Sequence, residues 1–484
     1  MKNIAAIIIL TTCLVLTACQ QASKTNNNIT NTSVADVNEL LINITIDALK
    51  EQDYIQAQRS INALILSNDE NVWDFIMSAI IRLPQELSME IIELSLSKDS
   101  VKNSSTQLYG IAKIFMSYKE TDQALKYINQ SIQLNQKYLE ARYWRARLLT
   151  LLKEYDKAES DFKFIVKQQP KNSNYSEQYA SFLQETKQYS KAQKILANQE
   201  VTAEILFKRI VFILQADDEI IAQNLYQKLK DLEVDENNKN NKYFLIAEAA
   251  YFLKNFKESE DYYRKVSGGD NYLDARDMVS LILFEAKRYD DAIEVLHQLQ
   301  NAEEKYAVKA YRLESQIKNL QGSPEEALQT LTRSLQIIPN NHTLLYDRAM
   351  LNESLNKMNL VKKDLLQIIN EDPNNFDALN ALGYSMADHD MELNKAHEYI
   401  LEAIALSPDN PAIIDSLGWI QYKLGMYEEA QESFNNALEK DINDSELYFH
   451  LYQTLLKLNK AEEATLLLKK AKALFPDNNK ILSL

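Results

Sequence analysis

The sequence has little glycine and cysteine, and each shortage excludes a class of protein. It contains 7 glycines among 484 residues. Loops that cradle phosphates and the sharp turn that presents a nucleophilic serine both depend on closely spaced glycines, so neither motif is present. Cys13 and Cys19 are the only cysteines. Residues 20–484 therefore form no internal disulfide, and packing alone must hold their fold.

Histidine is also scarce, and its distribution favours no metal site. Among 5 histidines, only His389 and His397, together with Asp388 and Asp390, are dense enough to be considered as a metal site. This segment is a predicted turn between two helices, where solvated polar residues are expected, and no cysteine supports it as a ligand set. We predict no metal and no cofactor.

The acidic residues indicate solvated helix faces rather than a catalytic centre. The chain has 69 of them and a net charge of −16. They gather at exposed positions, as in Glu428 and Glu429, and no cluster of lysine and arginine stands out against them. Such a surface repels phosphate backbones, so nucleic acid is excluded as a partner. We predict that the protein is not an enzyme.

A small residue recurs along most of the chain with a mean spacing of 34 residues. A large apolar residue follows each small residue by four positions. The first row is Ala124, Ala158, Ala192, Ala222, Ser259, Ala292, Ala327, Val361, Ala396, Ala430 and Ala464. The second row is Ile128, Phe162, Leu196, Tyr226, Tyr263, Leu296, Leu331, Leu365, Ile400, Phe434 and Leu468. Small residues allow helices to approach closely, and the large residue one turn later fills the space between them.

Two further features follow the same period. A third row of small residues, such as Ala112, Ala146 and Gly418, precedes most members of the first row by twelve positions. Five prolines follow the first row by twelve positions: Pro170, Pro339, Pro373, Pro408 and Pro476. Because proline lacks an amide proton and restricts the preceding residue, it ends one helix pair and begins the next.

The clearest repeat, Leu417–Ala430, closely resembles the tetratricopeptide repeat, in which two antiparallel helices form each unit. The resemblance implies an all-α fold, an α/α superhelical solenoid of such repeats. An ordinary helical bundle is the alternative, but it needs no common register over hundreds of residues. Irregular intervals around Ala222, beside the polar stretch 231–241, predict a longer loop or a bend there.

The N-terminus is similar to a bacterial lipoprotein signal. The apolar run Ile4–Leu16 is shorter than the about 20 residues that span a bilayer, but it suits a secretory signal. The following Leu16-Thr17-Ala18-Cys19 resembles the lipoprotein processing box, which implies that Cys19 carries the acyl chains, palmitate among them. A plain signal peptide with an accidental cysteine and an uncleaved anchor are the alternatives.

These features divide the chain into four predicted parts. They are a signal peptide (1–18), a flexible tether from Cys19 (19–35), divergent N-terminal helical repeats (36–104) and the regular solenoid (105–484). The tether is rich in Gln, Ser, Thr and Asn, a composition typical of disorder. Gln20 and Gln21 stand where the lipoprotein family uses aspartate for inner-membrane retention, so the resemblance implies a lipid-anchored location at the outer membrane, facing the periplasm.

The tetratricopeptide resemblance also implies a groove lined by the first helix of each repeat, where partners bind. The groove positions are Tyr346, Met350, Asn380, Tyr384, Asp415, Trp419, Tyr422, Lys423, Phe449 and Gln453. The aromatic members have packing between helices as an alternative role. Asn380, flanked by leucines, is suited to bind a peptide backbone. Lys309 and Arg312 do not form a complete carboxylate-binding set, so we predict no C-terminal-carboxylate receptor.

Residues 375–437 resemble one family more closely, the outer-membrane tetratricopeptide lipoproteins of proteobacteria. Asp377–Tyr384 and Glu402–Trp419 carry the likeness. One group in that family is the adaptor of a periplasmic carboxyl-terminal processing protease. The resemblance implies a non-catalytic scaffold that recruits this protease, its cell-wall hydrolase substrates, or both. A scaffold of an outer-membrane polysaccharide secretion or pilus assembly complex is the alternative, and an enzyme or sugar-binding protein is a third hypothesis.

Overall fold

The computed structural model describes residues 34–67 and 69–484, in which every regular element is helical. The predicted signal peptide, Cys19 and the tether as far as residue 33 lie outside the described residues. The chain divides into two units, one ending at Leu232 and one beginning at Glu233. We describe each unit separately as unit 1 and unit 2.

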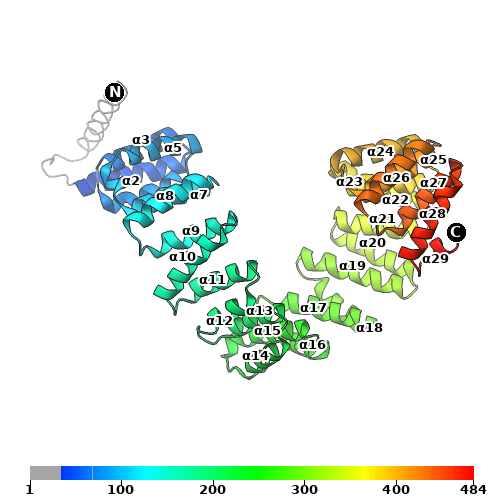
Figure 1. The fold of residues 1–484 in the computed structure, drawn as a ribbon, viewed down its shortest axis with the longest axis horizontal. Coiled ribbons are helices and arrows are strands. Elements are labelled where there is room, and N and C mark those ends of the chain that lie inside the picture. Colours follow the sequence, from blue (N-terminus) through cyan, green and yellow to red (C-terminus); the bar gives the residue numbers. More distant parts are fainter. Residues whose placement is uncertain (1–33, 68) are drawn as a thin grey trace. The chain divides into compact units, whose positions relative to one another are not determined.

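Unit 1 begins with helices of unequal length and continues as regular antiparallel pairs (Figure 1). Its early elements are α2 (Val34–Lys50), α3 (Tyr54–Ser67), η1 (Glu70–Val72), α4 (Trp73–Ile80), α5 (Gln85–Leu96) and α6 (Asp99–Lys102). The pairs are α7 (Ser105–Ser117) with α8 (Thr121–Leu134), α9 (Leu139–Leu151) with α10 (Tyr155–Gln168), α11 (Ser173–Glu185) with α12 (Tyr189–Leu196), and α13 (Ala203–Gln215) with α14 (Glu219–Asp231).

Unit 2 opens with η2 (Glu236–Asn238) and continues as seven helix pairs with a short final helix, α29 (Asn479–Leu482). The pairs are α15 (Lys239–Phe252) with α16 (Phe256–Lys265), α17 (Tyr272–Glu285) with α18 (Tyr289–Leu299), α19 (Glu304–Leu320) with α20 (Pro324–Ile337), α21 (His342–Ser354) with α22 (Met358–Glu371), α23 (Phe376–Asp388) with α24 (Leu393–Leu406), α25 (Pro411–Lys423) with α26 (Tyr427–Lys440), and α27 (Ser445–Lys457) with α28 (Ala461–Leu474).

The periodic small residues hold each pair together. All eleven members of the first row are buried, and so are ten of the large residues that follow them; Leu468, on α28, is half-buried. The approach is closest where the third row has glycine. A Cβ atom on Gly418 would lie 2.6 Å from the ring of Phe434. The predicted register of antiparallel pairs is therefore confirmed.

Proline and asparagine separate the pairs as the period predicts. The five periodic prolines all lie in the connections between one second helix and the next first helix. Asparagine then caps several first helices. The side chain of Asn341 accepts a hydrogen bond from the Leu344 amide at 3.2 Å, and that of Asn375 accepts one from the Ala378 amide at 3.0 Å. These caps satisfy amide groups that have no partner within the helix.

The turn inside each pair has its own signature. A residue with positive φ lies five positions before nearly every member of the first row. It is Gly322 or Gly425 in two repeats, and lysine, asparagine or aspartate in the others, such as Lys153 with φ of 61°. This left-handed residue ends the first helix and reverses the chain.

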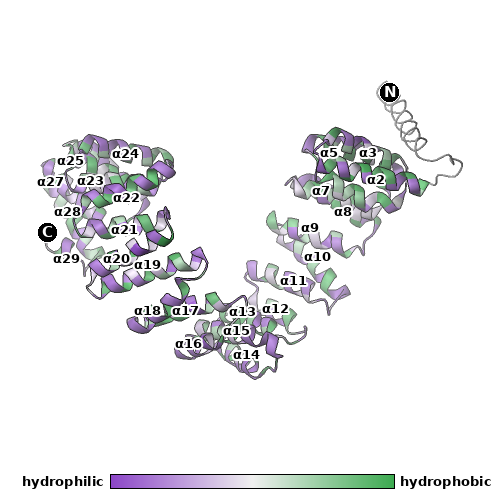
Figure 2. Ribbon diagram, turned by 180° about the vertical axis from the view of Figure 1, so that it is seen from behind, coloured by the Kyte–Doolittle hydropathy of each residue, from purple (hydrophilic) through white to green (hydrophobic). Residues whose placement is uncertain are grey.

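Hydrophobic and hydrophilic residues alternate along the helices of both units (Figure 2). The predicted all-α solenoid fold is confirmed.

A longer connection predicted near residues 231–241 is also confirmed, because α14 ends at Asp231 and α15 begins at Lys239. No described helix has the length and apolar character needed to cross a bilayer. The domain boundary between residues 104 and 105 stays a prediction.

Candidate partner-binding groove

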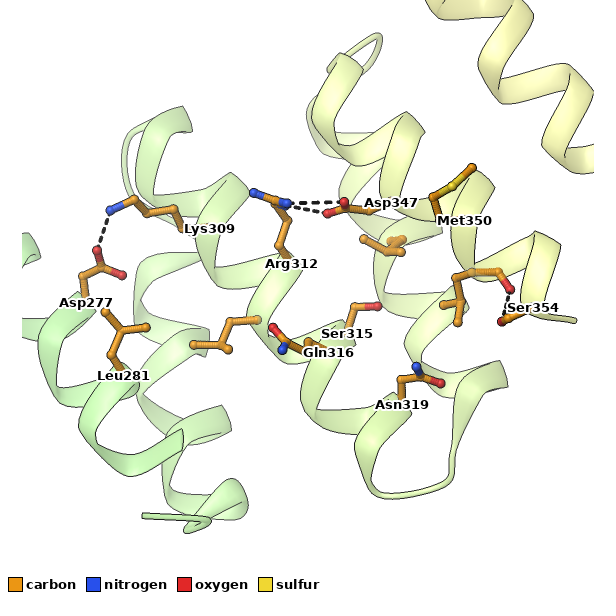
Figure 3. Close-up of a pocket in the computed structure, with 13 residues that line it drawn as sticks. Asp277, Leu281, Lys309, Arg312, Ser315, Gln316, Asn319, Asp347, Met350 and Ser354 are labelled. Carbon is orange, nitrogen blue, oxygen red and sulfur yellow. Dashed lines mark hydrogen bonds and ion pairs between the residues drawn. The ribbon is translucent and has the colours of Figure 1, made fainter. Parts of the chain in front are cut away.

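One hollow in unit 2 lies over three successive first helices. Residues of α17, α19 and α21 line a cavity of about 630 Å³, open to solvent (Figure 3). Leu281, Leu313 and Leu331 supply apolar surface, and Gln316 and Asn319 supply amides. A cavity of this size, lined by apolar side chains and by several polar and charged groups, can hold one or two side chains of a bound peptide.

Ion pairs link the three helices along the cavity. Lys309 on α19 contacts Asp277 on α17 at 2.6 Å, and Arg312 on α19 contacts Asp347 on α21, with Nη2 3.3 Å from Oδ1 (Figure 3). The side chains of both cations are about half exposed. Exposed pairs contribute only about 0–1 kcal/mol each, so a partner can replace either member at little cost. Each cation thus already has a carboxylate partner within the chain.

A second hollow, of about 400 Å³, shares Arg312 and Asp347 with the first. It extends the surface to His342, Thr343 and Tyr346 on α21, and to Asn375 and Asp377 at the start of α23. We call the two hollows together the groove. It presents carboxylates, cations, hydroxyls and leucine side chains in sequence along neighbouring repeats, and this arrangement suits an extended polypeptide rather than a small molecule.

Two of the predicted groove residues line these hollows. Met350 lies in the first and Tyr346 in the second. Burial, followed by the nearby carboxylates of Asp377 and Glu353, raises the pKa of Tyr346. The Tyr346 hydroxyl therefore remains a hydrogen-bond donor at neutral pH.

Asn380 and Tyr384 lie one turn apart on α23. Within the described residues, the Oδ1 atom of Asn380 is buried without a hydrogen-bond partner. An unpaired buried acceptor is costly, and because this atom is enclosed, peptide binding by Asn380 stays a prediction. The Tyr384 hydroxyl is also a donor, because burial and the carboxylates of Glu446 and Asp388 raise its pKa.

The remaining predicted residues form one packed cluster between α25 and α27. The ring of Trp419 stacks on Tyr422 at 5.2 Å and on His450 at 4.3 Å. His450 Nδ1 lies 3.0 Å from an Asp415 carboxylate oxygen, and both side chains are buried. Desolvation raises the pKa of Asp415. Packing explains the conformation of Trp419 and Asp415, and partner binding by either one stays a prediction.

The edge of this cluster is more accessible. Lys423 contacts Asp390 at 3.0 Å and lies 5.2 Å from the Trp419 ring. Phe449 is half-buried under Lys480, whose Nζ lies 4.0 Å from the ring centre, and Gln453 is half-buried one turn further along α27. The sequence analysis did not include His450 among the groove residues. Its spacing of 35 residues from Asp415, about one repeat, was the signal that could have placed the two side chains together. In the described residues, no group of three or more His, Cys, Asp or Glu side chains is placed to hold a metal ion.

Comparison with known proteins identifies the repeat. Tetratricopeptide-repeat family models match residues 109–173 and 413–440. A TPR repeat-containing protein of Pseudomonas aeruginosa is 34% identical over 209 residues, which cover 43% of this chain and 35% of that protein. A TPR repeat-containing protein of Methanocaldococcus jannaschii is 24% identical over 422 residues, which cover 85% of this chain and 65% of that protein.

The chain thus spans between about a third and two thirds of the length of these relatives. Among solved structures, the Cut9–Hcn1 hetero-tetramer of the APC/C is similar, with 14% identity, a TM-score of 0.38, and coverage of 92% of this chain and 95% of that one. The matched repeats and the paired helices agree with each other. Residues 109–173 and 413–440 are thus similar to tetratricopeptide repeats, and within each unit the described residues form the helix pairs of an all-α solenoid.

Proposed function

We propose that this protein is a non-catalytic scaffold, held at the outer membrane by lipid on Cys19 and facing the periplasm, that recruits a carboxyl-terminal processing protease, cell-wall hydrolases, or both. The groove of unit 2 carries the proposal. Its two hollows share one ion pair and extend over successive first helices, as an elongated binding surface requires. A scaffold that holds enzyme and substrate together raises their effective concentration without chemistry of its own.

The location and the partners rest on the sequence. The segment Leu16–Cys19 resembles a lipoprotein processing box, and residues 375–437 resemble the protease-adaptor lipoproteins. The similarity to a TPR repeat-containing protein of Pseudomonas aeruginosa supports a scaffold made of such repeats. Because the net charge of −16 opposes binding to anionic lipid, attachment would depend on the acyl chains.

Site-specific photo-crosslinking in intact cells tests the partners. A photoreactive amino acid replaces Gln316, which is exposed in the groove, and in a matched control it replaces Leu360, which is exposed on the second helix α22. We expect the groove variant to capture a processing protease or a wall hydrolase, and the control to capture neither. Capture of secretion or pilus components at Gln316 would favour the alternative scaffold, and identical products from both variants would contradict a role for the groove.

Lipid attachment is tested separately with the Cys19→Ser variant. Growth with a palmitate analogue should label the wild-type chain and not the variant, and the variant should leave the membrane fraction. A variant that keeps its membrane association would contradict anchoring through Cys19.

A further inference from the structure

Unit 1 has a distinct surface built from aromatic side chains. Tyr109 on α7 packs edge-on against Tyr138, with ring centres 5.2 Å apart. On the next first helix, α9, Tyr143 lies 5.5 Å from Trp144 and 5.8 Å from Tyr175 of α11. All five are half-buried, so part of each ring meets solvent. We call these five residues the tyrosine face.

Two cations lie over this face at equivalent positions. Lys113 Nζ is 5.8 Å from the Tyr109 ring, and Arg147 Cζ is 4.8 Å from the Trp144 ring and 5.8 Å from the Tyr143 ring. Each cation follows its tyrosine by four residues, which places both on one helix face. The two tyrosines are 34 residues apart, as are the two cations. Successive repeats therefore present the same aromatic–cation pair.

The repeat register places this face with the groove-facing row. Tyr109 precedes Ala124 by fifteen residues, and Tyr346 of the groove precedes Val361 by the same number. Lys113 likewise corresponds to Met350. Tyr109, Tyr143 and the two cations of the tyrosine face thus occupy positions that in unit 2 line the candidate groove.

The cations of the tyrosine face are available to a ligand, in contrast to their neighbours. Arg142 and Arg145 both bind the buried carboxylate of Asp161, at 2.6 Å each. Within the described residues, Lys113 and Arg147 contact aromatic rings and make no ion pair. The hydroxyls of the four tyrosines likewise have no hydrogen-bond partner in that part of the chain.

Charge adds a further argument. Residues 105–151 contain seven lysines and arginines against three acidic residues, a net charge of +4 within a chain of net charge −16. The acids whose charges act on the face are Glu140, at Tyr109, Tyr138 and Tyr175, and Asp74, at Tyr138. Burial, followed by Tyr138 and Glu140, raises the pKa of Tyr109, so that its hydroxyl remains a neutral donor. The face therefore combines unpaired cations, hydroxyl donors and exposed ring surface.

We propose that the tyrosine face binds an acidic, extended segment of a partner protein. Carboxylates of the segment would contact Lys113 and Arg147, its carbonyl groups would accept hydrogen bonds from the tyrosine hydroxyls, and its apolar side chains would cover the rings. Aromatic residues and arginine are the side chains that most often dominate the energy of an interface. This inference deepens the proposed scaffold function and rests on it.

Fluorescence anisotropy with the full chain and labelled twelve-residue peptides tests the proposal. One peptide alternates Glu with Tyr and Ser, and the comparison peptides carry Gln or Lys in place of Glu. We expect the acidic peptide to bind at least tenfold more tightly than either. Lys113→Gln combined with Arg147→Gln should weaken its binding at least tenfold. Lys167→Gln combined with Lys194→Gln removes the same charge from exposed positions on second helices of unit 1 and should change binding less than twofold.

Charge reversal supplies a gain of function. Lys113→Glu combined with Arg147→Glu should transfer the preference to the lysine peptide, and an unchanged circular dichroism spectrum verifies the fold. Equal losses in the two glutamine pairs, no binding of the acidic peptide, or stronger binding of a single-stranded oligonucleotide would overturn the proposal. Photo-capture of a protease through Gln316 in that event would leave the scaffold function standing.

Discussion

At the scale of single residues, Glu314 shows how a buried charge is accommodated in the solenoid. Its side chain is 1% exposed on α19. It accepts hydrogen bonds from Gln300, from Lys318 at 2.5 Å and from Thr330 at 3.2 Å, and Arg333 lies 3.4 Å away. Desolvation by itself raises the pKa of Glu314, but these donors and cations outweigh it and hold the pKa below its ordinary value of 4.5.

Replacing Glu314 by Gln should therefore destabilise the protein in a pH-dependent manner. A lowered pKa means that the carboxylate stabilises the fold above pH 4.5, and that this stability is lost as the pH falls through the lower folded-state value. We expect a loss of about 2 kcal/mol at pH 7, the usual worth of hydrogen bonds to a charged group. Urea unfolding at pH 7 and pH 3 measures it, and the difference from wild type should shrink at pH 3.

Glu326→Gln, on the exposed face of α20, is the matched control and should change the stability by less than about 0.5 kcal/mol at either pH. A loss for Glu314→Gln that was the same at both pH values would contradict the electrostatic account.

At the scale of elements, the left-handed turn inside each repeat lowers the stability of the fold wherever a residue other than glycine occupies it. Lysine holds this position at 119, 153, 187, 254 and 287, where φ is between 58° and 61°. Side chains other than glycine are strained there, because Cβ approaches the following carbonyl oxygen. Gly322 and Gly425 adopt the same conformation without that strain. The repeats with lysine therefore carry a stability cost at the turn.

Lys153→Gly should accordingly stabilise its repeat by about 0.5–1 kcal/mol, whereas Gly425→Ala should destabilise by a similar amount. Thermal unfolding of the two variants provides the measurement. Lys153→Ala separates the backbone from the side chain, since it removes the lysine but keeps Cβ, and it should leave the stability nearly unchanged. If Lys153→Ala stabilised as much as Lys153→Gly, the backbone explanation would be wrong.

At the scale of the whole molecule, stability is distributed along the array. Within each unit, a helix pair packs against its sequence neighbours, so interactions are local and the energy is approximately a sum over repeats and their interfaces. Phe162 illustrates such an interface. It is buried on α10, with its ring 5.2 Å from Phe182 and 5.8 Å from Tyr179, both on the first helix of the next repeat.

Phe162→Ala should open the repeats around it and spare distant ones. The cavity should lower the local stability by about 3 kcal/mol, which corresponds to roughly a hundredfold faster amide exchange in the helices that it supports. Hydrogen–deuterium exchange read by mass spectrometry should show the increase in α9–α12, with α25–α28 unchanged. Uniformly faster exchange over all helices would indicate a single cooperative unit instead.

The fold was predictable from the sequence because its information is local and repeated. A buried alanine such as Ala158 needs only its helix pair, and the same requirement recurs in every repeat. Five prolines marked the connections for the same reason. The left-handed position escaped notice, since lysine holds it in five repeats and carries no signal of its own there, and the backbone geometry reveals it.

The candidate sites were less predictable, because they depend on which side chains meet across different repeats. Sequence spacing placed Tyr346 and Met350 in the groove, yet it could not show that Asp277 and Asp347 neutralise Lys309 and Arg312. Nor did it show that Lys113 and Arg147 have aromatic neighbours and, among residues 34–67 and 69–484, no carboxylate partner, and the net charge of −16 concealed them.

The periodic backbone of this protein thus follows from residue spacing, since helix pairing is a contact between near neighbours in the chain. Its binding surfaces follow from long-range proximity, since the charge and exposure of each side chain are set by residues some thirty positions away.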